Sequence, residues 1–518
     1  MAMRVTTNMA MNLYRYNLGN SNYKMNNSMN KLSTQRRFDS FVEDPTSAVQ
    51  AWRIRRAMVD NANYQDNNKD TVNRFNVAFA TMGMVTNKLV DEAANDARVR
   101  GMNDPTAGAR VQVGQVLKNT ADSVIEAMNG AKYGDHFIFS GEDEMNAPFS
   151  WDGDKLYYRG INVNAGSVKN PAERPLPSWA LDDAGNEQFV RQVADLPANM
   201  PATGKDADEQ EWIDYYKSVK AELEGGGTPA AKPIPGTAVP AWANDGNGQA
   251  VNLALDNRVP EGMPAKSDDL YEQAWIDYCN DQVKAANDQN YTPTVIKPSL
   301  SPNDQGMAWG EPNEFGVPEA ANNVTDQDTA YNRMWAEYYK DQGDVKRLDK
   351  LADEEQNVDL GMGLDEKNGS LVKGSAFDRS LPGIKMLGYG VDENGDPNNV
   401  ALVMKRLGEI WESCDFESGD YPSEELKAEA TRLFDKLNLC HDDCISQYAE
   451  ITTKSKYLEE NQDRMGLQGA YLNEDLTSLE DIEPAEAISN FMYDYYCYNA
   501  ALKVGTQLLS QSLIDYMN

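Results

Sequence analysis

The chain has 518 residues, enough for several domains, and carries 82 acidic against 48 basic side chains, a formal net charge of −34. So acidic a chain is repelled by nucleic acid and by anionic membranes, which excludes both as expected partners. It contains no uncharged apolar run of about 18 residues, the length that a membrane-spanning helix needs. Its five cysteines follow no disulfide framework. The first residues lack the apolar core of a Sec signal peptide, so we expect a cytoplasmic protein or one exported by another route.

The N-terminal segment repeats in sevens. Apolar or small residues recur at alternating intervals of three and four, which is coiled-coil spacing. Serines interrupt this stripe and asparagines surround it, so the segment alone is not expected to stay helical in water. It needs a partner helix. The stripe consists of Met11, Tyr14, Leu18, Ser21, Met25, Ser28 and Leu32.

Three further helical segments follow in chain order. The first starts at "EDPTSAVQAW", where Asp44 is suited to cap a helix and Pro45 to occupy its first turn. The heptads of this helix continue to Ala93, and the segment "RGMNDPTAG" ends the helix. A second helix has one apolar face between Val113 and Ala131. Residues 423–466, far along the chain, are again amphipathic.

The middle of the chain has a different character. Residues 136–160, "HFIFSGEDEMNAPFSWDGDKLYYRG", alternate and turn as β-hairpins do. Beyond residue 168, Pro and Gly are dense, and three stretches recur at an offset of 63 residues, such as "EQEWIDYYKS" at 209 and "EQAWIDYCND" at 272. A degraded third copy includes "NRMWAEYYKDQ" at 332. Such a period indicates duplicated small modules, each with a short helix. We expect Trp212, Trp275 and Trp335 to be module cores, the alternative being an aromatic platform that binds a ligand.

The C-terminal segment also has helical periodicity. Its apolar stripe steps by three and four and is stronger than the N-terminal one. Residues 1–60 hold nine basic against four acidic side chains, and residues 481–518 hold one against five, so the two ends attract each other. A two-helix hairpin alone would leave much aromatic surface wet, which favours burial against other subunits, although an ordinary intramolecular bundle is the alternative. The stripe consists of Ile488, Phe491, Tyr495, Tyr498, Leu502, Gly505 and Leu509.

Helices at both ends of the chain predict a mainly α core with β-containing inserts. It would be an elongated antiparallel bundle or coiled coil built from both termini, with mixed α+β or β-rich outer domains inserted in the middle. We divide the chain into a terminal coiled-coil domain, a helical bundle with a β-hairpin, and an outer insert of tandem modules. These comprise, in that order, residues 1–45 with 482–518, residues 46–167 with 355–481, and residues 168–354.

No enzyme or cofactor signature emerges. The two histidines, His136 and His441, leave little for acid–base or metal chemistry, and no hydrolase, metalloprotease or P-loop motif occurs. "DENGDPNNVALV" begins like a calcium loop but has Pro397 and Val403 where Gly and Glu are required. "CHDDC" at 440–444 is an incomplete zinc site without distant ligands. We therefore expect no catalytic residue, metal or cofactor.

Several of these segments together resemble the flagellin superfamily. They are the N-terminal heptads, "FDSFVEDPTSAVQA", the "FIFSG" hairpin, residues 358–390 and the closing "ALKVGTQLLSQSLIDYM". Within the superfamily they resemble most the subunits that join the hook to the filament. The resemblance covers roughly residues 1–165 and 355–518, whereas the tandem modules depart from the family pattern.

The resemblance implies a non-enzymatic subunit, exported unfolded through the flagellar type III apparatus and located outside the cell. Its implied partners are identical subunits in a ring, the other hook-associated junction protein, flagellin and an export chaperone. A flagellin is the rival within the family, and a surface-displayed glycan-binding protein is the rival outside it. Carried over by position, the subunit contacts are Met11, Leu18, Met25, Leu32, Phe491, Tyr495, Tyr498, Leu502, Leu509 and Leu513.

Overall fold

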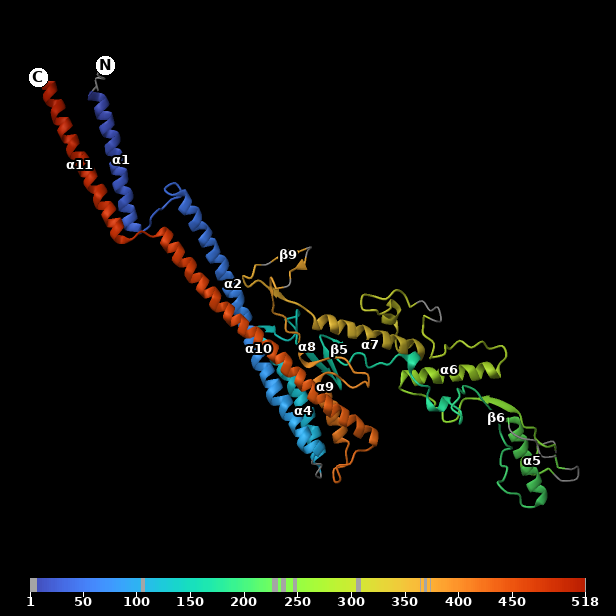
Figure 1. Cartoon of the computed structure of the whole chain (residues 1–518). Coiled ribbons are helices and arrows are strands. Elements are labelled where there is room, and N and C mark those ends of the chain that lie inside the picture. The colour runs from blue at the N-terminus through green and yellow to red at the C-terminus, as the bar shows by residue number, and fades with distance from the viewer. Residues whose placement is uncertain are drawn as a thin grey trace.

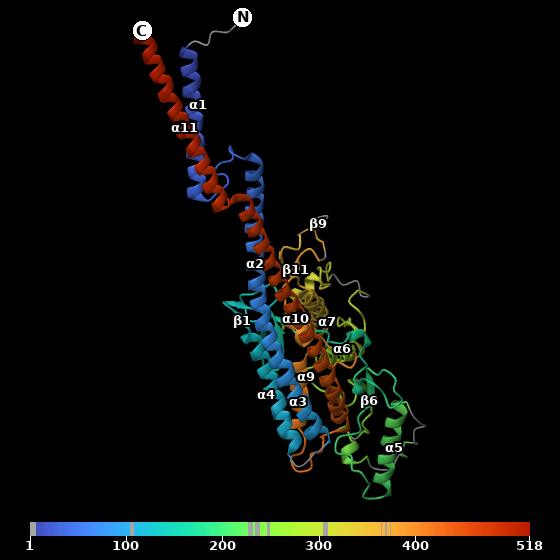
Figure 2. The same ribbon diagram turned by 60° about the vertical axis from the view of Figure 1, so that its left-hand side comes forward.

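The protein is an elongated set of helix pairs with an arm projecting from one side (Figures 1 and 2). In both views α1 and α11 lie side by side at one end, next to the two termini, and α2 and α10 continue from them. The computed structural model describes residues 7–103, 108–225, 232–233, 239–245, 249–303, 309–363, 365–367, 370–372 and 374–517. It is 59% helical, which confirms the predicted helical core with β-containing inserts.

The long pair consists of α2 (Pro45–Met84) and α10 (Glu424–Glu480). The predicted start of α2 is confirmed, because the Asp44 carboxylate accepts the backbone N–H groups of Thr46 and Ser47 and Pro45 occupies the first turn. Buried amides hold the two helices in register, with Asn68 Nδ2 donating to the Leu458 carbonyl at 2.9 Å. The helical run beyond α2 comprises η1 (Val85–Val90), α3 (Asp91–Asp96) and η2 (Ala97–Asn103).

A second pair, α4 (Ala109–Gly130) and α9 (Val400–Glu412), packs beside the far end of the first. The two helices approach closely because glycines meet at their crossing. A Cβ on Gly114 would lie 2.7 Å from the Gly408 carbonyl oxygen. Trp411, which is fully buried, lies against Gly101 in the same region. The crossing is therefore closed to larger side chains.

Short strands cover this core, and the predicted hairpins at 136–160 are present. The core continues through Phe139, Phe149 and Tyr158, whose hydroxyl donates to the Phe139 carbonyl at 3.0 Å. The elements are β1 (Lys132–Tyr133), β2 (His136–Phe137), β3 (Phe149–Asp152), β4 (Lys155–Tyr158), β5 (Ile161–Asn162), β8 (Asn357–Val358), β9 (Glu366–Lys367), β10 (Ser370–Leu371), β11 (Phe377–Asp378) and α8 (Gly383–Leu387). Their antiparallel pairs are β1–β2, β3–β4–β5, β8–β11 and β9–β10.

The arm holds the repeated modules, in which helices predominate over strands among the described residues. Each copy contributes one helix, with Trp212, Trp275 and Trp335 all buried. They are therefore core residues, and the alternative of an aromatic ligand platform is wrong. The arm comprises η3 (Pro171–Glu173), η4 (Ser178–Ala180), β6 (Arg191–Ala194), α5 (Ala207–Leu223), η5 (Ala241–Ala243), β7 (Leu255–Arg258), α6 (Leu270–Asn287), η6 (Glu319–Asn323) and α7 (Ala330–Ala352).

The first two copies, tandem in sequence, exchange segments in space, because each pairs its first tryptophan with the helix of the other. Trp179 of the first copy donates its indole N–H to Glu272 on α6, in the second copy, at 2.9 Å. Trp242 of the second copy makes the equivalent bond to Glu209 on α5, in the first copy, at 3.0 Å. The chain of the inner module, which contains α5, is thus inserted into that of the outer module, which contains α6. The inner module lies beyond the outer one at the tip of the arm (Figure 1), and the antiparallel pair β6–β7 joins them.

Candidate assembly interface

The seam between α1 (Thr7–Thr34) and α11 (Pro484–Met517) is the first part of the site. The two helices are antiparallel, with both chain ends at the same end of the pair (Figure 1). All seven residues of the predicted N-terminal stripe are half-buried or buried. On α11 buried or half-buried positions again alternate by four and three, at Ala487, Phe491, Asp494, Tyr498, Ala501 and Gly505, with Asn499 half-buried beside Tyr498.

Two contacts fix the register of this seam. The Ser28 hydroxyl donates a short hydrogen bond to the Asp494 carboxylate, which gives a polar partner to the one acid among the described seam residues. Near the other end, Tyr14 lies directly over Gly505. A Cβ at that position would be 1.9 Å from the tyrosine oxygen. The glycine that interrupts the apolar stripe in the sequence therefore provides the space that Tyr14 occupies.

A joint connects this pair to the long pair α2–α10. The Arg37 backbone N–H donates to the Glu480 carbonyl at 2.6 Å, and the Ile482 N–H donates to the Gln35 carbonyl at 3.1 Å. Phe38 and Ile482 are buried beneath these bonds. An ion pair of 2.6 Å between Arg55 on α2 and Glu480, the last residue of α10, links the two helices at the joint. Both chain segments turn together here, so the joint sets the direction in which the terminal pair leaves the core.

The outward face of α11 carries a second apolar stripe, displaced by about one residue from the seam. Ile488, Met492, Tyr495 and Leu502 are spaced by four, three and seven, so they share one flank of the helix. Their exposed fractions are 51%, 41%, 44% and 38%. The helix therefore presents one apolar stripe to α1 and another to water.

The outward face of α1 is apolar as well. Met9, Leu13, Tyr16 and Tyr23 follow the same spacing and are each more than half exposed. The terminal pair is thus a two-helix ribbon with apolar side chains on its outer surfaces. Contiguous exposed apolar surface of this kind marks an interaction site, and an isolated pair of helices has few contacts to stabilise it.

The predicted contact residues fall into three groups. Those in the seam within one chain are Met11, Leu18, Met25, Leu32, Phe491 and Tyr498, and those on the outward stripe are Tyr495 and Leu502. Leu509 and Leu513 belong to α11, but their side chains lie outside the described residues. Sequence reasoning missed Met492 and the outward stripe of α1, whose spacing was visible but not separated from the inner stripe.

The cysteine cluster has structural contacts. The Cys440 and Cys444 thiols point to the backbone carbonyls of Asn398 and Met386, at 3.4 Å and 3.6 Å. Burial raises the pKa of the Cys444 thiol to about 12 and that of Cys440 to about 11. Thiolates are therefore disfavoured there. Within the described ranges, no three His, Cys, Asp or Glu side chains are placed to hold a metal ion.

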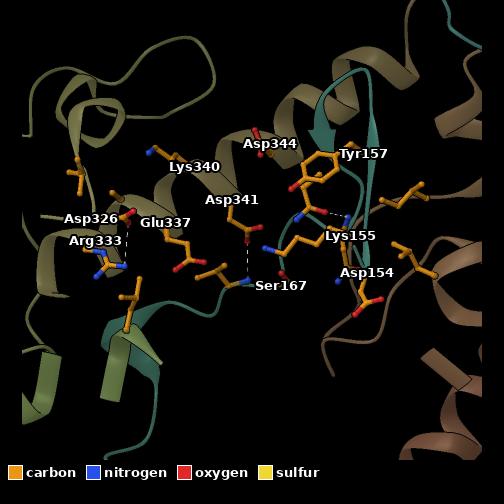
Figure 3. Close-up of a pocket in the computed structure, with 18 of the residues that line it drawn as sticks. Asp154, Lys155, Tyr157, Ser167, Asp326, Arg333, Glu337, Lys340, Asp341 and Asp344 are labelled. Atoms are coloured by element: carbon orange, nitrogen blue, oxygen red, sulfur yellow. Dashed lines mark hydrogen bonds and ion pairs between the residues drawn. The ribbon is translucent and has the colours of Figure 1, made fainter. Parts of the chain in front are cut away.

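A polar cleft of about 570 Å³ lies where the arm meets the core (Figure 3). Lys155 and Asp154 reach it from the β3–β4 hairpin, and the acidic and basic side chains of α7 lie opposite. Asp341 on α7 accepts the backbone N–H groups of Gly166 and Val168 at 2.9 and 3.0 Å. Since these residues lead into the arm, the carboxylate fastens both segments at its base. Burial raises the pKa of Asp341 despite those two bonds.

The comparison with protein families gave one result that bears on this ribbon. Residues 5–144 match the family model of the bacterial flagellin N-terminal helical region. That segment contains α1, α2, α4 and the first hairpin. The match supports the flagellin superfamily and, with it, a structural subunit that self-assembles into an extracellular flagellar polymer. A search of curated proteins found no match to the chain. None of the described helices is both long and apolar enough to cross a membrane.

Proposed function

We propose that the protein is the flagellar subunit that joins the hook to the filament, of the kind known as hook-associated protein 3. The single observation that carries assembly is the terminal ribbon, whose outward stripes on α1 and α11 stay 38–68% exposed in the single chain. The junction role rests on the resemblance of the "FIFSG" hairpin and of residues 501–517, "ALKVGTQLLSQSLIDYM", to that branch of the superfamily.

The ribbon has the properties of a surface that becomes stable on assembly. Ordering a residue costs about 1–2 kcal/mol of backbone entropy, and the seam alone buries only one side of each helix. Neighbouring copies would bury the outward stripes and so stabilise the ordered form. Identical copies forming a ring, with the other hook-associated junction protein below and flagellin above, are the partners that fit this arrangement.

Two properties of the chain are consistent with export without a cleaved signal peptide. A marginal terminal ribbon and five free cysteines, with no disulfide, are compatible with passage in the unfolded state. A chaperone that covers the outward stripe of α11 before export would prevent premature association of the exposed side chains.

A filament subunit is the second candidate, because the matched helical region is that of flagellins. The two roles differ in where the protein is needed. In a strain that lacks the gene, a junction role predicts cells with hooks, no filaments and flagellin released into the medium. Hooks with normal filaments after deletion would contradict the proposal, and loss of the filament polypeptide itself would favour the flagellin role.

A further inference from the structure

A second exposed apolar surface lies at the joint, outside the seam and its outward stripes. A hollow of about 410 Å³ is lined by residues 36–55 and by Glu480. Phe41, Val42 and Trp52, on or beside it, are 61%, 87% and 62% exposed. Exposed side chains of this size around a hollow form a surface suited to receive an apolar side chain. We call it the joint groove.

Arginines outnumber carboxylates around the joint groove, although the chain as a whole is strongly acidic. Residues 36–56 hold five arginines against Asp39, Glu43 and Asp44, and Glu480 completes the lining. Arg36 lines it, and the Arg56 guanidinium lies 6.0 Å from the ring of Trp52. Arg36, Arg37, Arg53 and Arg56 take part in no ion pair within the part of the chain that the structure describes. A local excess of unpaired arginine favours an acidic partner.

The same chain carries a matching surface at the base of α11. Tyr493 is 71% exposed there, the largest exposed fraction among the described apolar residues of that helix. Glu486 lies two turns earlier on the same flank, and Glu483 immediately precedes the helix. Neither carboxylate forms an ion pair with any described residue of its own chain. This flank differs from the one that bears Ile488 and Leu502.

We propose that the joint groove of one copy receives Tyr493 and the acidic base of α11 from a second copy of this chain. Both surfaces lie close to the joint, because Tyr493 is only nine residues into α11, or roughly 14 Å at about 1.5 Å per residue. The contact therefore links neighbouring copies whose joints lie at the same height along the long axis of the assembly. Since the two surfaces differ, it is heterologous and continues from copy to copy around a ring or helix. The inference rests on the proposed assembly and identifies one of its contacts.

The native cysteines allow a direct test. Cys497 is exposed and lies one turn from Tyr493, whereas Cys279, Cys414, Cys440 and Cys444 are buried. The full-length Val42→Cys variant is produced in the natural bacterium, and its sheared surface appendages are oxidised mildly. A disulfide forms only when the two Cα atoms approach to within about 7 Å. We expect a ladder of dimers, trimers and larger species, with mass spectrometry identifying the 42–497 bond.

Two controls accompany this measurement. Val42→Cys combined with Cys497→Ser should remain monomeric, and so should Leu439→Cys, which places a new thiol at an exposed position of α10 remote from the joint. A ladder in either control would show nonspecific coupling and overturn the assignment.

Charge reversal gives an independent readout that does not depend on disulfide geometry. Arg53→Glu with Arg56→Glu should lower incorporation into appendages at least tenfold, and adding Glu483→Arg with Glu486→Arg should restore most of it. The matched control is Arg98→Glu, which lies in η2 far from the joint and should incorporate normally. A ladder or this rescue supports the contact. Appendages that contain the variants but show neither overturn it, whereas wild-type protein absent from appendages overturns the proposed function itself.

Discussion

The outward stripe of α11 makes the most informative target for mutation. Ile488→Asp with Leu502→Asp changes two side chains that are 51% and 38% exposed in the single chain. Fully burying an aliphatic side chain contributes about 1.5–3 kcal/mol, so covering the part that is still exposed contributes about 1 kcal/mol at each site. Losing both contributions, about 2 kcal/mol, weakens a subunit contact about 30-fold. Desolvation of two carboxylates adds to this loss.

The assay is the pelletable fraction of purified protein over a range of concentrations, with circular dichroism of the dilute protein as the measure of folding. The double variant should keep its helicity and stay in the supernatant. Two comparisons sharpen the result. Leu439→Asp, exposed on α10, should pellet normally, and Phe491→Asp, in the seam, should lose helicity as well as assembly. A double variant that pellets at the wild-type concentration would refute the outward stripe as a subunit contact.

Three other predictions concern the seam, the core and the arm. Gly505→Val should displace Tyr14, whose oxygen lies 1.9 Å from the position of the new Cβ, and hydrogen exchange should then accelerate in residues 7–20 while the core is unchanged. In the core, burial opposes ionisation of Glu144, but hydrogen bonds from Arg74 and Gln356 outweigh it and hold the pKa of that carboxyl below its usual range. Its stabilising contribution is therefore present above about pH 4.5 and lost as the pH falls through the folded-state pKa, and urea titrations should show a shallower acid dependence for Glu144→Gln. Replacing residues 195–254 by Asn-Gly joins β6 to β7 through a two-residue hairpin turn, and the shortened protein should keep its unfolding temperature and its assembly, because the inner module has its own core of Trp212, Tyr216 and Ala243.

The features that sequence predicted well are those that depend on local chemistry. Asp44 followed by Pro45 specifies a helix start by itself, because a carboxylate and a fixed φ angle satisfy the first turn without help from the rest of the chain. The seven seam residues of α1 were likewise all predicted, because their alternating spacing of three and four specifies one face of a helix, although the outward apolar stripe of the same helix was not separated from them. The predicted helical core follows from such segments at both ends.

The two stripes of α11 could not be separated in the same way. Phe491 and Met492 are adjacent and both apolar, as are Ala501 and Leu502. Apolar residues therefore occupy both faces of the helix, and their spacing alone does not separate the seam from the outward stripe. The predicted stripe accordingly mixes Phe491, which is half-buried in the seam, with Tyr495, which is 44% exposed on the outward stripe. Only the packing of α1 decides which side is buried.

The crossed pairing of the modules was also beyond local reasoning. Trp179 and Trp242 occupy equivalent positions in the repeat, and so do Glu209 and Glu272, so each tryptophan could pair with either glutamate. Sequence order suggests pairing within a copy, whereas the structure pairs each tryptophan with the other copy's helix. The pairing of β6 with β7 determines which helix each tryptophan reaches, and the repeat pattern in the sequence does not indicate that pairing.

One local signal was available and was missed. The loop beginning at Asp392, considered only as a calcium loop, is closed by the same backbone hydrogen bond as the module loops beginning at Asp182, Asp245 and Asn313. In each, the backbone N–H of the first residue donates to the carbonyl four residues later, at 2.9–3.0 Å. The bridges that flank these loops all join residues six apart. The turn of the repeated module therefore also occurs inside the core, where Lys436 and Arg432 pair with Asp392 and Asp396.

The most direct test of the proposed role is the position of the protein on the intact flagellum. Antibodies raised against residues 170–350, which form the projecting arm, would be located by immunogold electron microscopy on flagella with their hooks attached (Figure 1). A junction subunit predicts gold confined to the boundary between hook and filament. Gold along the whole filament would contradict the junction role in favour of a filament subunit, and flagella without gold would contradict a flagellar role altogether.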